Sequence, residues 1–363
     1  MSKVEHKFVP VVLVVYFVVM SMYAIFRAHI MLLYQIKPTD LLIFNESFSS
    51  VLRGTGFFYN SIEKTSHFGI HNSPILFFLL LFYKFWPSID LLVITQTLAI
   101  TVGAIPIFKL AEELLRDERK AFSIMLLYMF SPFILGIIRF DFHAVSLAVP
   151  FITLTMYYLE KGDYKKAFFS SLIVLLARED AGLFPLSLGL MMVTTNKGSK
   201  KLRWAILYSL IGILWIALSV FVVIPHFSVF RFSSRYNGEI LWKFVGFLIL
   251  AMFTTTGFLP ILAGERLVLI LIPFLELALS NYWAMLSIGD HYQWLLGPLL
   301  VVVSIYGAQK IQSSKKFWLS ILVGGIFSIL FSPIIQTIPR YPYVIGTRID
   351  LVFKLALKLW FVS

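Results

Sequence analysis

Apolar runs separated by short charged segments make up most of the chain. The first run extends from Phe8 to Phe26 and is preceded by Lys3 and Lys7. A helix of this length is sufficient to cross a hydrocarbon layer of roughly 30 Å. Because no small-residue cleavage site follows the run, we predict a retained first span whose amino end is cytoplasmic.

Further apolar runs predict a series of membrane-spanning helices. Two of them, 167–177 and 181–195, are short and flank Arg178, Glu179 and Asp180. A single helix over both runs would place three charges in mid-membrane, so we predict two half-length helices whose charged apex packs against protein. With this pair and the first span, we expect about eleven spans. The remaining predicted spans are 91–110, 121–138, 144–159, 204–224, 241–262, 267–280, 294–306 and 317–331.

Two regions depart from this pattern. The segment 27–90 loses its continuous hydrophobicity and predicts a long first outer loop. Within it, the range 74–85 is apolar but too short for a spanning helix, which needs ~20 residues. We therefore predict a juxtamembrane or re-entrant helix there. After Arg348, Lys354 and Lys358 fall on one helical face among apolar residues, which is typical of an interfacial amphipathic helix.

Composition supports an all-α polytopic membrane protein, with one transmembrane domain over 1–335 and an outer-face segment over 336–363. The chain is 59% hydrophobic and 14% charged, and its mean hydropathy is +0.86; a soluble core could not bury this much apolar surface. The net charge of +12 lies in clusters between apolar runs, where it indicates orientation and not nucleic-acid binding. The absence of cysteine excludes disulfides and thiolate chemistry.

The predicted topology places titratable chemistry on one side of the cell (plasma) membrane. Of the seven histidines, only His6 falls on the predicted inner side. The outer histidines are His29, His67, His71, His143, His226 and His291. Lys and Arg are concentrated in the short inner segments, as expected for cytoplasmic loops.

The segment from Arg139 to His143 is the strongest candidate for chemistry. It lies between two apolar runs and holds Arg139, Asp141 and His143 within five residues. A carboxylate and an imidazole this close at a membrane surface are typical of a functional site, and we predict an active site facing the outside. The alternative is a hydrogen-bonded cap at the interface.

The order of these parts resembles that of GT-C glycosyltransferases. It is closer to a prokaryotic membrane family grouped with them, domain of unknown function 2079. The matching residues extend roughly from 38 to 300; they are Asp40 to Phe44, His71 to Pro74, Gln96, Phe140 to His143, Arg178 to Asp180, His291, Tyr292 and Pro298. Leu42 departs from the pattern, since the family usually has glycine there. The resemblance implies a GT-C-like helical bundle.

The resemblance also implies an activity, sugar transfer from a polyprenyl-phosphate donor to a lipid, protein or glycan on the outer face. Transfer requires a base for the acceptor hydroxyl and positive groups for the departing phosphate. Asp40 is the implied base. Asp141 is a second carboxylate that orients the acceptor or, with His143, binds a divalent cation such as Mg²⁺ or Mn²⁺.

The remaining candidates concern substrate binding. Arg178, with Arg139 or Arg231, is suited to hold a phosphate through paired hydrogen bonds. Glu179 and Asp180 are predicted to orient Arg178, although all three could form a self-contained salt-bridged turn. His71 and His291 are further substrate-binding candidates, with structural packing as the alternative for His291.

Two other classes of function fit a polytopic chain with outer charges. One is a transporter or lipid flippase, although transporters usually place ionisable groups near the bilayer midplane at broken helices. The other is a non-catalytic membrane scaffold that has the same fold.

Overall fold

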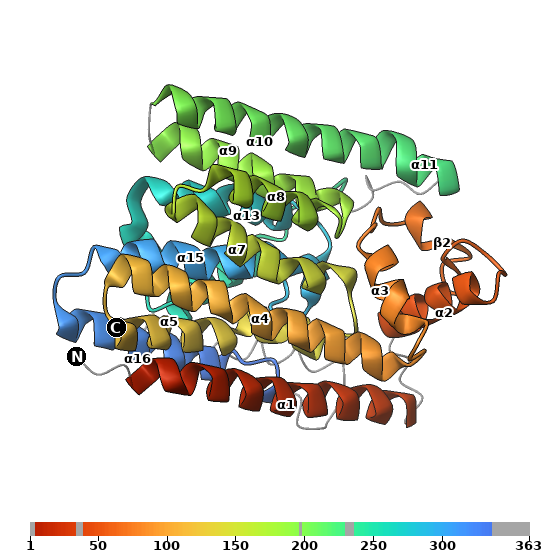
Figure 1. The fold of residues 1–363 in the computed structure, drawn as a ribbon, viewed down its shortest axis with the longest axis horizontal. Helices are drawn as coiled ribbons and strands as arrows, with labels where there is room; N and C mark the ends of the chain where they lie inside the picture. Colours follow the sequence, from red (N-terminus) through yellow and green to blue (C-terminus); the bar gives the residue numbers. More distant parts are fainter. Residues whose placement is uncertain (1–3, 34–38, 196–197, 229–235, 336–363) are drawn as a thin grey trace.

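A computed structural model describes residues 4–33, 39–195, 198–228 and 236–335. The predicted amphipathic helix in 336–363 and the candidate Arg231 therefore lie outside the described residues. The main helices run along the long axis of an almost entirely helical bundle, and α2, α3 and β2 lie at one end of it (Figure 1). The start of α1 lies at the opposite end.

A few long helices are separated by several shorter ones along the chain. The α-helices are α1 (Val4–Leu33), α2 (Thr39–Leu52), α3 (Leu76–Tyr83), α4 (Ile89–Leu115), α5 (Glu118–Met129), α6 (Pro132–Arg139), α7 (Val149–Glu160), α8 (Tyr164–Leu175), α9 (Leu183–Thr195), α10 (Ser199–Leu218), α11 (Ile224–Phe227), α12 (Trp242–Thr254), α13 (Leu271–Ala278), α14 (Trp283–Leu286), α15 (Leu296–Gln309) and α16 (Ser314–Leu330). The other elements are β1 (Tyr59–Asn60), β2 (Thr65–Ser66), η1 (His67–Gly69), η2 (Ala144–Ala148), η3 (Glu179–Gly182), the π turn η4 (Ser219–Val223), η6 (Leu259–Ile270) and η7 (His291–Trp294).

Three continuous helices in the described residues are long and apolar enough to cross a membrane: Lys7–Leu33, Ile89–Leu115 and Ser199–Phe227. Two bent pairs raise this number to five if each pair is one span. The pairs are α5 with α6, bent by 42°, and α12 with Leu259–Ala278, bent by 116°. The membrane character of the chain is thus confirmed, whereas the expected count of about eleven spans is not.

The three long helices occupy different positions in the bundle. Within their most apolar windows, α1 is only 22% buried and the Ser199–Phe227 helix 17%, whereas α4 is 67% buried. Since the exposed side chains of the first two helices are largely aliphatic, these faces suit contact with lipid. The centre is formed by α4 and α15, and residues 296–308 of α15 are all buried.

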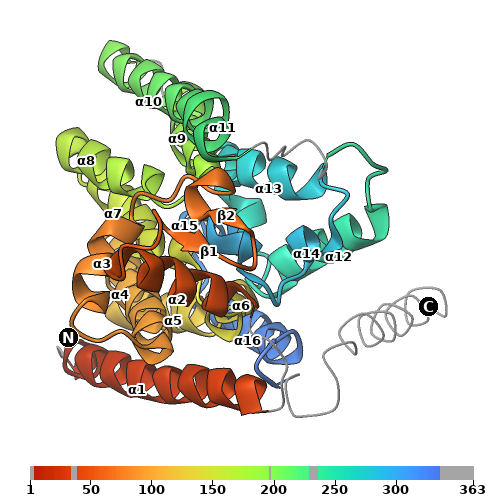
Figure 2. The same ribbon diagram turned by 90° about the vertical axis from the view of Figure 1, so that its right-hand side faces the viewer.

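The segment 27–90 contains the short apolar helix that the sequence predicted, together with elements that it did not predict. The predicted apolar helix at 74–85 corresponds to α3, and the antiparallel pair β1–β2 and helix α2 precede it. Figure 2 shows α2, α3 and both strands together at the end of the bundle. Leu42 lies within α2, so this position needs no glycine turn.

The predicted pair of half-length helices is also present, as α8 and α9 separated by η3. Gly182 lies so close to α10 that a Cβ atom there would be 2.5 Å from the carbonyl oxygen of Gly212. The indole nitrogen of Trp215 in α10 donates a hydrogen bond to the carbonyl oxygen of Arg178, 3.0 Å away. Helix α10 therefore fixes the charged break between α8 and α9.

Candidate functional site

The segment that follows α6 is held in place by α4. The Nε2 group of Gln96 donates to the carbonyl oxygen of Ile137 at 2.9 Å, and Gln96 Oε1 accepts from the backbone N–H of His143 at 2.9 Å. Gly136 allows α6 to approach the segment before η7, because a Cβ atom there would be 2.4 Å from the carbonyl oxygen of Ile288. The segment after α6 and the segment before η7, which are far apart in sequence, are therefore in contact.

Asp141 is paired with an arginine of the first helix. Arg27 Nη1 donates to Asp141 Oδ1 at 3.1 Å. Burial raises the pKa of Asp141, and the charge of Arg27 limits the rise. This carboxylate is therefore already balanced by a cation.

Asp40 has a different environment in the first turn of α2. Burial, and then the negative charge of Asp141, raise the pKa of Asp40 to about 7. Within the described part of the chain, no Lys or Arg lies at ion-pair distance from its carboxylate. A carboxyl group with such a pKa can accept a proton near neutral pH.

His143 and His291 form a stacked pair. Their ring centroids lie 3.9 Å apart and their planes differ by 14°. Burial, together with His291 and Arg178, lowers the pKa of His143 well below its usual value. His143 is therefore neutral at physiological pH. The ring of His71 also lies near His143, with its centroid 6.0 Å away.

Asp40, His143 and His291 each offer one ligand atom, and these atoms lie within 4.8 Å of one another. The sequence predicted a different set, Asp141 with His143. The structure groups Asp40 with the two imidazoles instead, because Asp141 is engaged by Arg27. Two imidazoles also favour a transition metal over Mg²⁺, which prefers oxygen ligands.

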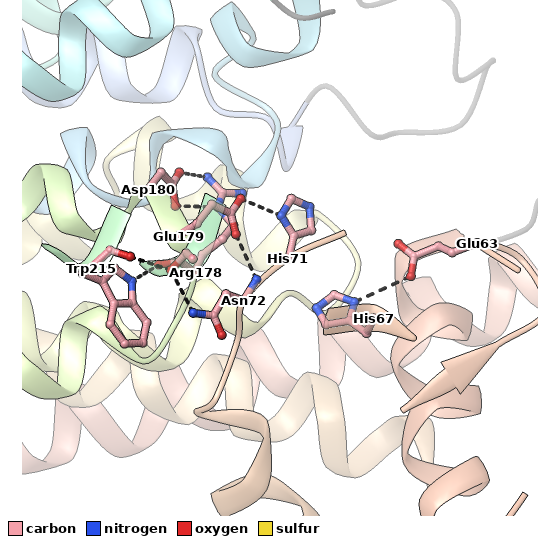
Figure 3. A network of polar contacts seen from close by, with 9 residues as sticks. Glu63, His67, His71, Asn72, Arg178, Glu179, Asp180 and Trp215 are labelled. Atoms are coloured by element: carbon pink, nitrogen blue, oxygen red, sulfur yellow. Dashed lines mark hydrogen bonds and ion pairs between the residues drawn. The ribbon is translucent and has the colours of Figure 1, made fainter. Parts of the chain in front are cut away.

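Glu179 connects the α8–α9 break to the segment before α3. Its Oε1 lies 2.8 Å from His71 Nδ1, and its Oε2 accepts from the backbone N–H of Asn72 at 3.1 Å (Figure 3). The side chain of Asn72 donates to Ser219 Oγ at 2.8 Å. Glu179 was expected to orient Arg178; it holds His71 instead.

Arg178 is buried and orientated by Asp180, as the sequence predicted. Its Nε donates to Asp180 Oδ1 at 2.7 Å and its Nη2 pairs with Oδ2, and the guanidinium lies near the rings of Tyr292 and Trp294. Burial alone would raise the pKa of Asp180, but the charge and hydrogen bonds of Arg178 hold it below its usual value. Among the described residues, Nη1 of Arg178 has no hydrogen-bond partner.

The other candidate cation, Arg139, donates through Nη1 to the carbonyl oxygen of Gly289 at 3.1 Å. It therefore secures the segment before η7. In the described residues, Arg178 has a buried terminal nitrogen, Nη1, without a hydrogen-bond partner, whereas the unpartnered nitrogen of Arg139 is Nε.

Comparison with known families gives one finding. A family model described as "Predicted membrane protein (DUF2079)" matches residues 32–344, which is most of the chain. The chain belongs to this family. Neither the curated proteins nor the solved structures contain a significant match to it. The recognition of domain of unknown function 2079 from the ordered motifs is thus confirmed.

All eight predicted site residues of this DUF2079 chain lie in one connected group at the end of the bundle that holds α2. Sequence analysis missed two members. Arg27 stands at the end of an apolar run, where a cation usually anchors the helix. Asp290 adjoins His291, and burial raises its pKa to about 6. The partner of Arg27 is distant in the sequence, and Asp290 is buried only in the folded chain. The residues next to them therefore give no signal of either role.

Proposed function

We propose that this DUF2079 protein is a glycosyltransferase that transfers a sugar from a polyprenyl-phosphate donor to an acceptor hydroxyl. One arrangement carries the proposal. A carboxylate without a basic partner among the described Lys and Arg residues, Asp40, lies in the same group as Arg178, a buried guanidinium with an unused donor. Displacement at a phosphate-linked sugar needs these two kinds of group.

The proposed step has four parts. The acceptor oxygen forms a bond to the anomeric carbon, and the bond between that carbon and the phosphate oxygen breaks. The proton of the acceptor hydroxyl moves to Asp40. The polyprenyl phosphate leaves with the bonding electrons, and Arg178 stabilises its charge through Nη1.

The other polar residues position these groups. Glu179 fixes His71 and the segment that enters α3, and Asp180 fixes Arg178. Asp141 is the candidate for orienting the acceptor, and Arg27 balances its negative charge. In this proposal, the lipid tail of the donor lies in the bilayer along the apolar helices. We also propose that the shorter helices cross the membrane, which gives about eleven spans in total.

We also propose that the site faces the outside of the plasma membrane, with a cytoplasmic amino terminus. The start of α1 and the connections from α4 to α5 and from α15 to α16 lie at one end of the bundle, opposite α2 (Figure 1). The connections carry Arg116 and Lys310, and Arg119 and Lys315 lie in the first turns of the helices that follow. Basic residues gather at cytoplasmic ends of spans, which supports this orientation.

The test is transfer of radiolabelled sugar from a polyprenyl-phosphate donor by protein purified in detergent, with a cell-envelope fraction as the acceptor source. We expect Asp40→Asn to reduce the rate at least about 100-fold, the usual worth of a general base. Asp90→Asn is the matched control, since Asp90 pairs with His29 outside the site group. Equal rates in wild type and Asp40→Asn would remove Asp40 from the mechanism.

A transporter or lipid flippase is the second candidate, and one observation favours it. The break between α8 and α9 carries the buried residues Arg178 and Glu179, and transporters place such groups at broken helices. Reconstituted liposomes separate the two functions. Movement of a labelled polyprenyl-phosphate lipid between leaflets without sugar transfer would favour the flippase over the enzyme. Absence of both activities would favour the scaffold.

A further inference from the structure

Three side chains from three separate segments converge in the site. Asp40 begins α2, His143 follows α6, and His291 begins η7. Their ligand atoms lie within 4.8 Å of one another, which brings three potential metal ligands together.

We propose that Asp40, His143 and His291 bind one divalent transition-metal ion of the Zn²⁺ or Mn²⁺ class. As a metal site the inference stands on geometry; the role of the ion in catalysis rests on the proposed function. Two imidazoles and one carboxylate leave further coordination positions for substrate, as in catalytic sites with three protein ligands.

The burial of His143 is an independent observation. The residue is 4% exposed, and in the described part of the chain its Nδ1 atom has no hydrogen-bond partner. A buried polar atom without a partner costs free energy, and a bound ion or a ligand carried by that ion would remove the cost. If His143 served only for packing, its unpartnered Nδ1 atom would contribute nothing to stability.

The surrounding charges also favour a cation. Asp141, Glu63 and Asp290 all lie near enough to Asp40 to act on it electrostatically, and His71 acts in the opposite direction. Arg27 balances Asp141 and His67 lies 3.8 Å from Glu63. Asp40 itself has no such partner among the described Lys and Arg residues, so a divalent ion would supply the missing positive charge.

Binding requires a small local adjustment. Ligand atoms around a tetrahedral ion with bonds of about 2.0–2.1 Å lie roughly 3.4 Å apart. The stacked rings of His143 and His291 lie in nearly parallel planes, so at least one ring must rotate toward the ion. Gln96 bonds to the backbone N–H of His143 and not to its ring, so a rotation of the ring would keep this hydrogen bond.

The ion would complement the proposed transfer. Coordination lowers the pKa of a bound hydroxyl, so an acceptor hydroxyl on the ion needs only a weak base. Asp40 can then ligate the ion through one oxygen and accept the acceptor proton at the other. Arg178 remains available for the departing phosphate.

The experiment measures metal binding in the full chain without substrate. The protein is purified without a polyhistidine tag, treated with chelator and titrated with Zn²⁺, and bound metal is counted by mass spectrometry. A parallel titration with Co²⁺ records visible absorption, whose intensity reports the ligand geometry. We expect one ion per chain in the wild type and at least about tenfold weaker binding in Asp40→Asn, His143→Ala and His291→Ala.

His226→Ala is the matched control, because His226 is an exposed histidine outside the ligand group and should leave binding unchanged. His143→Gln keeps a polar side chain of similar size, and thermal unfolding checks that each variant is folded. Absence of a bound ion in the wild type, or unchanged binding in the folded histidine variants, would overturn the metal site. Sugar transfer that persists in chelator would reject the catalytic role of the ion and leave the proposed function intact. Metal binding without sugar transfer would support the metal site and reject only the glycosyltransferase function.

Discussion

Arg27 and Asp141 are 114 residues apart in sequence, yet their side chains form an ion pair of 3.1 Å. The pair joins α1 to the segment that carries His143. The side chain of Arg27 is 21% exposed and that of Asp141 10%, so neither charge is fully hydrated. A mostly exposed apolar helix is thereby attached to the site.

We predict that Arg27→Gln destabilises the protein, because it leaves the Asp141 carboxylate buried without its cation. The expected loss is about 1–3 kcal/mol in the free energy of unfolding. Asp141→Asn in the same chain should recover part of this loss, since the buried charge is then absent. Unfolding in detergent of both single variants and the double variant measures the coupling, and additive effects would show that the ion pair contributes nothing.

Arg178→Lys tests the phosphate contact. Lysine keeps the charge but cannot bind Asp180 and a phosphate in one plane, so we expect the dissociation constant of a polyprenyl-phosphate lipid to rise about 10-fold to 100-fold. Calorimetric titration measures the constant. Arg53→Lys, at an exposed position beyond α2, is the control. If a folded Arg178→Lys variant binds the lipid normally, Arg178 does not contact the phosphate.

Gly136→Ala tests the contact between α6 and the segment before η7. The added Cβ atom would be 2.4 Å from the carbonyl oxygen of Ile288 and 3.2 Å from that of Asp290, so the two backbones must separate. We expect a loss of about 1–3 kcal/mol in unfolding free energy and weaker Co²⁺ binding, because His291 moves away from His143.

Gly325→Ala provides the matched control for that substitution. Gly325 lies in α16, and a Cβ atom added there would have no neighbour within 4 Å outside the backbone of its own helix. Alanine at this position should stabilise the helix by up to about 1 kcal/mol. Equal stability of the Gly136→Ala variant and the wild type would mean that the two segments can separate without cost.

The absence of native cysteine makes the orientation directly testable. Ser61 is exposed between β1 and β2, and Ser199 is exposed at the start of α10. We expect a membrane-impermeant maleimide to label Ser61→Cys in intact cells and Ser199→Cys only after permeabilisation. The reversed pattern would place the site on the cytoplasmic side, and labelling of both in intact cells would contradict the topology.

Sequence patterns predicted the parts of the fold that depend on local composition. The long apolar run that became α4, the short α3 and the division between α8 and α9 all follow from run length and from the charges of Arg178 to Asp180. The span count was not predictable in the same way, because the chain bends sharply after α12 and because α7 is short. A bend between two apolar helices changes the path of the chain without changing its hydropathy.

The membership of the candidate site was also predictable, but its pairing was not. Ordered motifs indicated Asp40, His71, Asp141 and His291, and the structure brings them together. Which carboxylate meets which cation depends on packing across the bundle. The neighbouring residues do not indicate which of Asp40 and Asp141 has a cationic partner, yet Arg27 neutralises Asp141 and leaves Asp40 beside His143.

The stacking of His143 on His291 has a consequence for biosynthesis. Ribosomes deliver the two rings at different times, with α7 to α14 emerging between them. An unfinished chain already inserted in the bilayer therefore lacks a ligand of the group until η7 has been made. Under the proposed function, an incomplete chain would therefore not consume the lipid-linked donor.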